Sequence, residues 1–398
     1  MNRPLLAALT LVLSAGLPLA AMAQDAKSVQ PATAAPTSAL PAAHKPQVQL
    51  AILLDTSGSM DGLIEQAKTQ IWGIVNDLAT AKQRAERPAL TVALYEYGKS
   101  TIPASEGYLR QILPLTDDLD EVSNQLFALT TNGGEEYCGQ VIEAATKGLS
   151  WSTDPADLRI IVIAGNEPFS QGTVDYHKTV PEAAKKGIIV NTIFCGNRQE
   201  GVQTGWEDGA RLGEGQYGFI DQGATVPHID APQDGDIARL SGELNLTYIP
   251  FGAEGDRAAA RQEAQDKNAA GASPEAQVAR AQTKSSYLYS NAGWDLVDAV
   301  KEKKVKLEEV AAKDLPQNMQ QMSPAQREAY VKQQLESRAS LQQQIQGLTA
   351  ARDEFVAKKR KEQAGQPSTL AAALIATIRK QAQDHGFTYD AKGGESGK

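Results

Sequence analysis

Short apolar runs alternate with amphipathic helical patterns between residues 48 and 252. Continuous apolar runs predict strands at 48–54, 90–97, 159–164 and 188–194, with a weaker edge strand at 108–115 and a short one at 218–220. Helical spacing between and after them predicts helices at 63–84, 118–129, 139–149, 175–186 and 237–246. Because continuous apolar strands are typical of sheets covered on both faces, the alternation predicts an α/β fold with a doubly wound, mostly parallel sheet over residues 47–252.

The composition changes after Gly252, where Ala, Gln, Glu, Lys and Arg dominate and strand-like runs disappear. We therefore expect a polar linker at residues 253–285 and an all-α region at residues 286–398. The aromatic residues Tyr287, Tyr289 and Trp294 are interpreted as core or interface anchors.

One long helix is predicted in this region, beginning at Ser323 and Pro324 and ending near Ala364. Apolar positions spaced by about 3.5 residues line one side of it, and polar ones interrupt them. The apolar positions are Leu341, Ile345, Leu348 and Phe355, and the interruptions are Gln334, Arg338 and Arg352. The interrupted pattern favours packing against neighbouring helices of the chain. A coiled coil, or a homo-oligomer formed through these helices, is the alternative.

The first 23 residues have the order of a secretory signal peptide. Arg3 precedes an apolar run at 5–19, and Ala-Met-Ala at 21–23 is a small-x-small cleavage site. Residues 24–46 are rich in Ala, Pro, Ser and Thr, which predicts a flexible linker. We therefore expect a mature chain that starts near Gln24 and is exported to the periplasm or the cell surface. An uncleaved anchor is the alternative, and no other segment is long and apolar enough to span a membrane.

The size and the net charge of the chain limit the folds it can form and the partners it can bind. The chain has 398 residues, of which 41% are hydrophobic, so it can bury a sizeable core and a smaller second unit. Its formal net charge of −9 argues against nucleic acid or an anionic membrane as the main partner.

Acidic and hydroxyl side chains follow the first predicted strand directly, in the stretch LAILLDTSGSM at 50–60. Asp55, Ser57 and Ser59 lie where that strand ends, and the carboxyl ends of parallel strands open onto the binding crevice of such a sheet. One carboxylate and two hydroxyls suit a hard divalent cation such as Mg²⁺, Mn²⁺ or Ca²⁺, and Gly58 lets the loop turn tightly. The alternative is that these side chains only cap the following helix.

The sequence Asp55-Thr56-Ser57-Gly58-Ser59 resembles the D-x-S-x-S motif of the von Willebrand factor A domain, and the resemblance extends over residues 48 to about 252. GIIVNTIFCG at 187–196 is similar to that family's penultimate strand, and GEGQYGFID at 213–221 is similar to the Gly-rich turn before its last strand. The resemblance implies a metal-ion-dependent adhesion site, in which a divalent cation bridges to an acidic group of a partner protein.

The chain departs from the family pattern in two loops. The family completes its site with a Thr from a second loop and an Asp from a third. In the second loop, TTNGGEEYCG, we expect Glu135 to replace the Thr as a metal ligand, with Thr131 behind it. In the third loop, Gly165 stands where the family has Asp, with Asn166 and Glu167 as compensating residues. The lost carboxylate predicts weaker affinity or a changed ion preference, and partner binding without metal stays open.

Within this resemblance, Cys138 and Cys195 are both expected near the crevice end of the sheet. In an oxidising compartment they are candidates for a disulfide that would fix the second loop. Two buried free thiols are the alternative.

Catalytic patterns are missing from the sequence, so we expect a binding module rather than an enzyme. The four histidines have neither zinc-site spacing nor a recognisable nucleophile beside them. A metal-assisted hydrolase with His228 or Glu135 as the base is one alternative. The other is a metal-independent envelope scaffold that assembles through its C-terminal helices.

Overall fold

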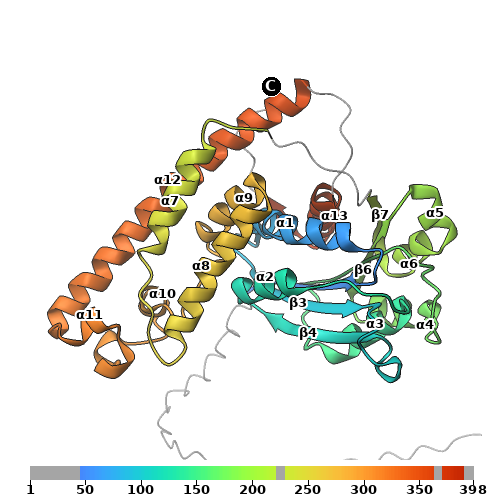
Figure 1. Cartoon of the computed structure of the whole chain (residues 1–398), viewed down its shortest axis with the longest axis horizontal. Coiled ribbons are helices and arrows are strands. Elements are labelled where there is room, and N and C mark those ends of the chain that lie inside the picture. The colour runs from blue at the N-terminus through green and yellow to red at the C-terminus, as the bar shows by residue number, and fades with distance from the viewer. Residues whose placement is uncertain (1–44, 221–228, 363–369, 390–398) are drawn as a thin grey trace, which may run out of the picture. The chain divides into compact units, whose positions relative to one another are not determined.

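Six strands form a central sheet within the part of the chain that the computed structural model describes, residues 45–220, 229–362 and 370–389 (Figure 1). Their order is β4-β3-β1-β5-β6-β7, and all neighbours are parallel except β3 and the edge strand β4. The strands are β1 (Gln47–Asp55), β3 (Ala89–Tyr97), β4 (Leu109–Thr116), β5 (Leu158–Gly165), β6 (Ile188–Cys195) and β7 (Glu214–Ile220). The predicted doubly wound, mostly parallel sheet is confirmed. The expectations for residues 1–44 lie outside the described residues.

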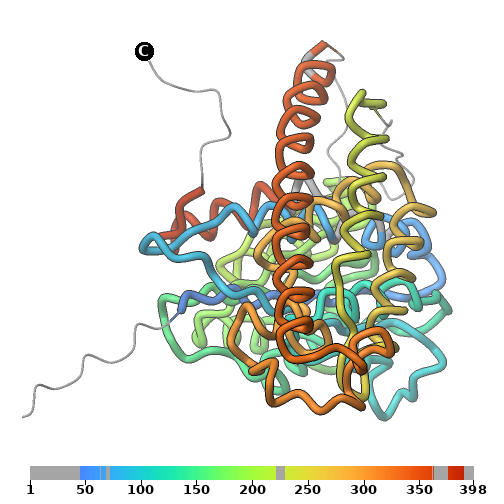
Figure 2. The backbone as a smooth tube through the Cα atoms, turned by 90° about the vertical axis from the view of Figure 1, so that its left-hand side faces the viewer, coloured from blue at the N-terminus to red at the C-terminus, as the bar shows by residue number. Residues whose placement is uncertain are grey.

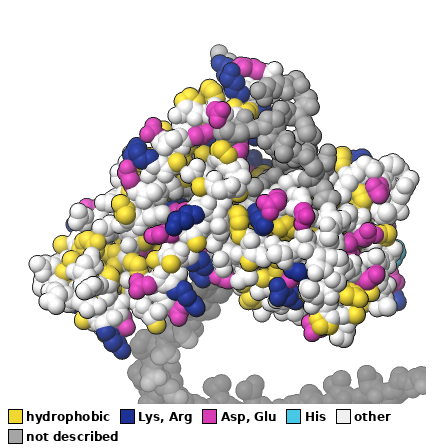
Figure 3. All heavy atoms as spheres, in the orientation of Figure 1, with side chains coloured by type: hydrophobic (Ala, Val, Ile, Leu, Met, Phe, Trp, Pro, Cys, Tyr) yellow, Lys and Arg dark blue, Asp and Glu magenta, His cyan; other side chains and the backbone are white. Residues whose placement is uncertain are grey.

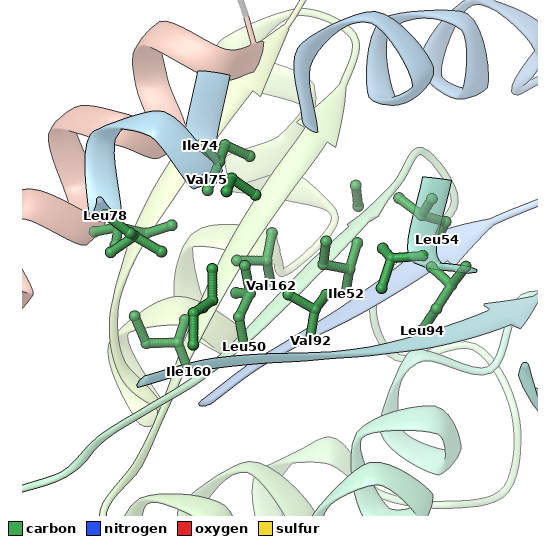
Figure 4. Packing of buried hydrophobic residues seen from close by; sticks show 14 of the residues in the cluster. Leu50, Ile52, Leu54, Ile74, Val75, Leu78, Val92, Leu94, Ile160 and Val162 are labelled. Atoms are coloured by element: carbon green, nitrogen blue, oxygen red, sulfur yellow. The ribbon is translucent and has the colours of Figure 1, made fainter. Parts of the chain in front are cut away.

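Helices cover both faces of this sheet, and α1, α2 and α13 lie on the opposite face from α3, α4 and α6. They are α1 (Asp61–Leu78), α2 (Leu119–Ala128), α3 (Cys138–Gly148), α4 (Tyr176–Lys185), α5 (Arg198–Gln203), α6 (Trp206–Leu212) and α13 (Leu370–Asp384), with the short turn η1 (Ala104–Glu106). The residues of β1 alternate between the two cores: Leu50 and Ile52 face α1, and Leu53 faces the other side. Figure 4 shows the first core, where Ile74 and Val75 of α1 pack over side chains of β1, β3 and β5. Each such buried side chain contributes roughly 1.5–3 kcal/mol of transfer free energy.

Two elements differ from the sequence-based expectation. The helix predicted to reach residue 84 ends at Leu78, and the chain continues into β2 (Ala81–Gln83), which pairs antiparallel with β8 (Phe387–Tyr389). The partner strand lies about three hundred residues further along the chain, so no local pattern indicates this pairing. The strand β7 begins at Glu214, earlier than predicted, and its second residue is a glycine that lies close to β6. A Cβ on Gly215 would lie 2.0 Å from the carbonyl oxygen of Val190 on β6.

The residues predicted to form a polar linker form two packed helices instead, α8 (Gly255–Ala272) and α9 (Pro274–Lys284). Their polar side chains are buried in an ion network with the sheet domain. The guanidinium of Arg280 pairs with Asp120 of α2 at 2.6 Å and with Asp266 at 2.8 Å, and Lys284 pairs with Asp266 at 2.6 Å. Arg280 also stacks over Trp72 of α1, 4.6 Å from the ring centre. A polar sequence can be buried here because its charges are paired within the network.

The long helix α12 (Pro324–Glu362) begins where the sequence predicts, and it runs along α7 (Figure 2). The other elements of this region are α7 (Asp234–Asn245), α10 (Leu296–Lys301), η2 (Leu307–Glu309), η3 (Ala312–Asp314) and α11 (Gln317–Gln320). The two arginines that interrupt the apolar side are buried ion-pair partners: Arg338 binds Asp295 at 2.6 Å, and Arg352 binds Asp234 at 2.6 Å. The apolar side of α12 is therefore covered within the chain.

Two features are relevant to membrane and nucleic-acid binding: the distribution of charge on the surface, and the length and hydrophobicity of the helices. On the face that Figure 3 shows, basic and acidic side chains are interspersed rather than gathered into a patch of one sign. None of the helices in the described residues combines the length and the apolar character that a membrane span needs.

Candidate functional site

The strand β1 ends in a buried carboxylate, Asp55, which has no exposed surface. One oxygen, Oδ1, accepts a hydrogen bond from the backbone N–H of Ser57 at 2.7 Å. The hydroxyl oxygens of Ser57 and Ser59 lie 3.1 Å apart. The helix α1 starts at Asp61 after Met60, and no side chain caps it. The capping interpretation of these residues is therefore wrong, and their side chains are left for another role.

A second carboxylate lies beside Asp55, and it belongs to Glu136 rather than to the expected Glu135. Glu136 is buried, with 4% of its surface exposed, whereas Glu135 points to solvent. Both Asp55 and Glu136 border Gly98: a Cβ built on that glycine would lie 2.6 Å from Asp55 Oδ1 and 2.9 Å from Glu136 Cγ. A side chain at residue 98 would therefore push into the carboxylate pair, and the backbone there also has a positive φ of 81°.

The two carboxylates perturb each other. Burial, followed by the charge of Asp55, raises the pKa of Glu136, and burial raises the pKa of Asp55. Glu167 on the third loop adds a smaller repulsive effect to both. Asp55 Oδ2 and Glu136 Oε2 are buried and have no hydrogen-bond partner. Buried acceptors without a partner are costly, so the pair needs either a proton shared between the two carboxyl groups, which the raised pKa of Glu136 favours, or a bound cation.

Packing around the third loop explains why this chain has Gly165 at the position where the family has Asp. A Cβ on Gly165 would lie 2.5 Å from the Tyr97 hydroxyl and 3.2 Å from Asp55 Cβ. That hydroxyl is fixed, since Tyr97 is fully buried and donates to the carbonyl of Ala164 at 3.0 Å. The next residue, Asn166, reaches the cluster instead, and its amide donates to Ser59 Oγ at 3.0 Å.

The second loop is fixed to the strand ends by backbone and side-chain hydrogen bonds. Asn132 N–H donates to the Thr56 carbonyl at 2.9 Å, and Lys99 donates to the Thr130 hydroxyl at 2.9 Å. Thr131, expected behind Glu135, hydrogen-bonds to Asp61 at the start of α1. Thr131 is thus a neighbour of α1 rather than of the Asp55 carboxylate.

The two cysteines are free thiols, so the expected disulfide is not formed. Cys138 packs on the α3 and α4 side of the sheet, with its Sγ 3.8 Å from the Tyr97 hydroxyl, whereas Cys195 packs in the core on the α1 side. The sheet separates the two sulfurs, although both residues lie near its crevice end. Burial raises the pKa of both thiols, as expected for unreactive core cysteines.

The donor set fits a hard cation with few charged ligands. Asp55 and Glu136 supply carboxylate oxygens, and Ser57 and Ser59 supply hydroxyl oxygens, which are ligands that Mg²⁺, Mn²⁺ and Ca²⁺ accept. No cluster of three or more His, Cys, Asp and Glu residues with metal-binding geometry occurs among the described residues. Neutral oxygens must therefore complete any cation shell at this position. His228, the alternative catalytic base, lies outside the described residues.

The motif at residues 55–59 lies within the part of the chain that matches a known protein family. The family model of the von Willebrand factor type A domain matches residues 49–202. Similar solved structures include BatB from Bacteroides thetaiotaomicron, which is 20% identical over 44% of this chain and 90% of its own, with a TM-score of 0.34. A second is an aerotolerance-related membrane protein from Bacteroides fragilis, which is 18% identical over 44% of this chain and 92% of its own, with a TM-score of 0.30. A third is the SpRpn10 VWA domain, which is 16% identical over 44% of this chain and 88% of its own, with a TM-score of 0.34. The comparison with curated proteins found no match. Residues 49–202 of this chain are therefore a von Willebrand factor type A domain, and a helical region follows that domain.

Proposed function

We propose that the von Willebrand A domain of this chain is a protein-binding module that holds a divalent cation and uses it to capture a carboxylate of a partner protein. Domains of this family are commonly protein-interaction modules. The observation that carries the proposal is the pair of buried, unpartnered oxygens on Asp55 and Glu136, next to the hydroxyls of Ser57 and Ser59.

Glu136 compensates for the missing aspartate. The family's second loop supplies a Thr and its third loop an Asp, whereas here the second loop supplies Glu136 and the third has Gly165. The number of carboxylates is kept while one of them moves to another loop. Asp55 and Glu136 would neutralise the ion, and the two hydroxyls would add uncharged ligands. A bound cation with an incomplete protein shell supplies a positive centre on which an outside carboxylate can bind.

We propose a binding role rather than catalysis. A hydrolytic use of the same cation needs a base within reach of the substrate. Of the two candidates from the sequence, Glu135 is exposed beside the cluster, and His228 lies outside the described residues. The metal-independent scaffold is less favoured, because α8 and α9 pack on the domain instead of projecting from it toward another protein. Whichever of these roles the chain has, we propose from its N-terminal residues that it is exported to the periplasm or the cell surface.

Cation binding by the purified mature chain tests the proposal. Mn²⁺ binding is measured by electron paramagnetic resonance, with Mg²⁺ and Ca²⁺ as competitors. We expect Glu136→Gln and Asp55→Ala each to weaken Mn²⁺ binding by about tenfold or more, because each removes a charged ligand. The matched control is Glu135→Gln, which changes the adjacent exposed carboxylate and should leave the affinity unchanged. Equal loss in both glutamine variants, or no Mn²⁺ binding by the unmodified chain, would overturn the proposal.

A further inference from the structure

A groove of about 280 Å³ lies beside the Asp55 cluster, between the first turns of α1 and the second loop. Its lining residues are Asp61, Ile64, Glu65, Lys68, Leu129, Thr130 and Thr131. One of its lining residues, Asp61, follows Ser59 of the candidate cation site by two residues in the chain. The hydroxyl of Thr131 hydrogen-bonds to Asp61 and closes one end of the groove.

The groove has an apolar floor and an acidic rim. Ile64 and Leu129 form the floor, with 2% and 6% of their surfaces exposed. Asp61 and Glu65 lie one helical turn apart on α1, so their exposed carboxylates stand on the same side of the helix. Asp61 lies in the first turn, where a negative charge stabilises the helix through its dipole. Glu65 lies in the second turn, where this stabilisation is small.

The cations near this rim already have partners. Lys68 pairs with Glu65 at 2.9 Å, and its ammonium nitrogen lies over the ring of Phe127, 5.9 Å from the ring centre. Lys99 pairs with the buried Glu96 at 3.6 Å and donates to Thr130. Asp61 has no lysine or arginine of the described residues within salt-bridge distance. The rim therefore keeps a net negative charge above apolar surface.

We propose that this groove is a subsite for a basic side chain, lysine or arginine, of the protein whose acidic group binds at the cation site. The aliphatic stem of such a side chain would cover Ile64 and Leu129, and its charged end would lie at Asp61 and Glu65. The partner is then recognised by an acidic and a basic residue on one surface. The link to the acidic group rests on the proposed function, whereas the preference of the groove for a cation does not.

The test uses two small probes that differ only in the terminal ammonium group, N-acetyl-lysine methylamide and N-acetyl-norleucine methylamide. Each is titrated into the full mature chain carrying ¹³C-labelled isoleucine and leucine methyl groups, and the shifts of Ile64 and Leu129 are followed. We expect the lysine probe to bind about two- to fivefold more tightly, as one exposed ion pair allows. Glu65→Gln should reduce this preference. The matched control is Glu143→Gln, which removes the carboxylate of a similar exposed ion pair, with Lys147 on α3.

A third variant distinguishes a specific effect on binding from a general loss of structure. Lys68→Met removes the competing cation, so it should strengthen binding of the lysine probe while Glu65→Gln weakens it. Equal binding of the two probes, an absence of shifts at Ile64 and Leu129, or weaker lysine binding in Lys68→Met overturns the proposal. The titration is repeated with EDTA and with Asp55→Ala. Lysine preference that persists there would show that the subsite acts without the cation, whereas the cation proposal fails separately, if the unmodified chain binds no Mn²⁺.

Discussion

Asp55 and Glu136 bring two buried carboxylates together at the end of β1, and each keeps one oxygen without a hydrogen-bond partner. Two like charges in one buried site destabilise the domain unless a proton or a cation offsets them. The arrangement links stability to cation binding, because an ion that binds only the folded chain stabilises it.

The first prediction concerns this pair. The pKa of Glu136 is raised to about 9, so at neutral pH without a cation the folded chain must take up a proton there that the unfolded chain does not hold. In EDTA at neutral pH, Glu136→Gln removes this cost and should raise the melting temperature by a few degrees, about 2–4 °C for each kcal/mol. In excess Mg²⁺ the same variant should lose the stabilisation that the unmodified chain gains. Differential scanning calorimetry with and without Mg²⁺ measures both. Glu135→Gln is the control, and a Glu136→Gln chain that Mg²⁺ stabilises as much as the original would contradict the expectation.

A second prediction concerns the glycine of the third loop. Gly165→Ala should destabilise the domain by about 1–3 kcal/mol, because its Cβ would collide with the buried hydroxyl of Tyr97. Gly133→Ala in the second loop is the control, since a Cβ there meets no atom within 4 Å. Urea unfolding curves compare the two. Adding Tyr97→Phe to Gly165→Ala should recover part of the loss, and an additive further loss would show that the contact is not the cause.

The sequence motif located the candidate site, but not all of its members. Asp55, Ser57 and Ser59 are adjacent in the chain and follow a continuous apolar strand, so local pattern alone places them together. Glu135 and Glu136 are identical neighbours in a loop. Which one is buried depends on the folded loop, where the Glu136 N–H donates to Gln171 and its side chain borders Gly98. No periodicity carries that information.

The helices α8 and α9 show the same limit on a larger scale. Their sequence is polar and rich in alanine, which is also the composition of a linker. They are held by partners far away in the chain: Asp120 on α2 pairs with Arg280, and Asn76 on α1 donates to the carbonyl of Ala279 at 2.8 Å. A buried charge can be predicted only when its counter-charge is known, and here the two lie 160 residues apart.

The third prediction tests that network through pH. Burial lowers the pKa of Lys284 to about 8, below its ordinary value of 10.5. Between these two values the unfolded chain holds the Lys284 proton more often than the folded chain does, so the contribution of Lys284 to stability rises with pH across this window. The free energy of unfolding of the original chain, minus that of Lys284→Met, should therefore increase from pH 8 to pH 10.5. A difference that is flat or falls across the window would contradict this sign.

The last prediction concerns how the helical region is attached to the von Willebrand A domain. Arg280 is buried between Asp120 and Asp266 and stacks on Trp72, so its loss leaves Asp120 without a counter-charge and Asp266 with Lys284 alone. Arg280→Ala should therefore destabilise the whole chain by about 3–5 kcal/mol, and Arg280→Lys should recover only part, since lysine cannot make the same forked contacts. Arg239→Ala is the matched control, because Arg239 forms exposed ion pairs on α7 with Asp236 and Glu243. Hydrogen exchange at the amides of α1 and α9 shows whether Arg280→Ala destabilises the domain together with the helices or the helices alone. If Arg280 holds the helices on the domain, protection falls at α1 and α9 together in Arg280→Ala, whereas loss confined to α9 would mean that the domain does not depend on the helices that cover it.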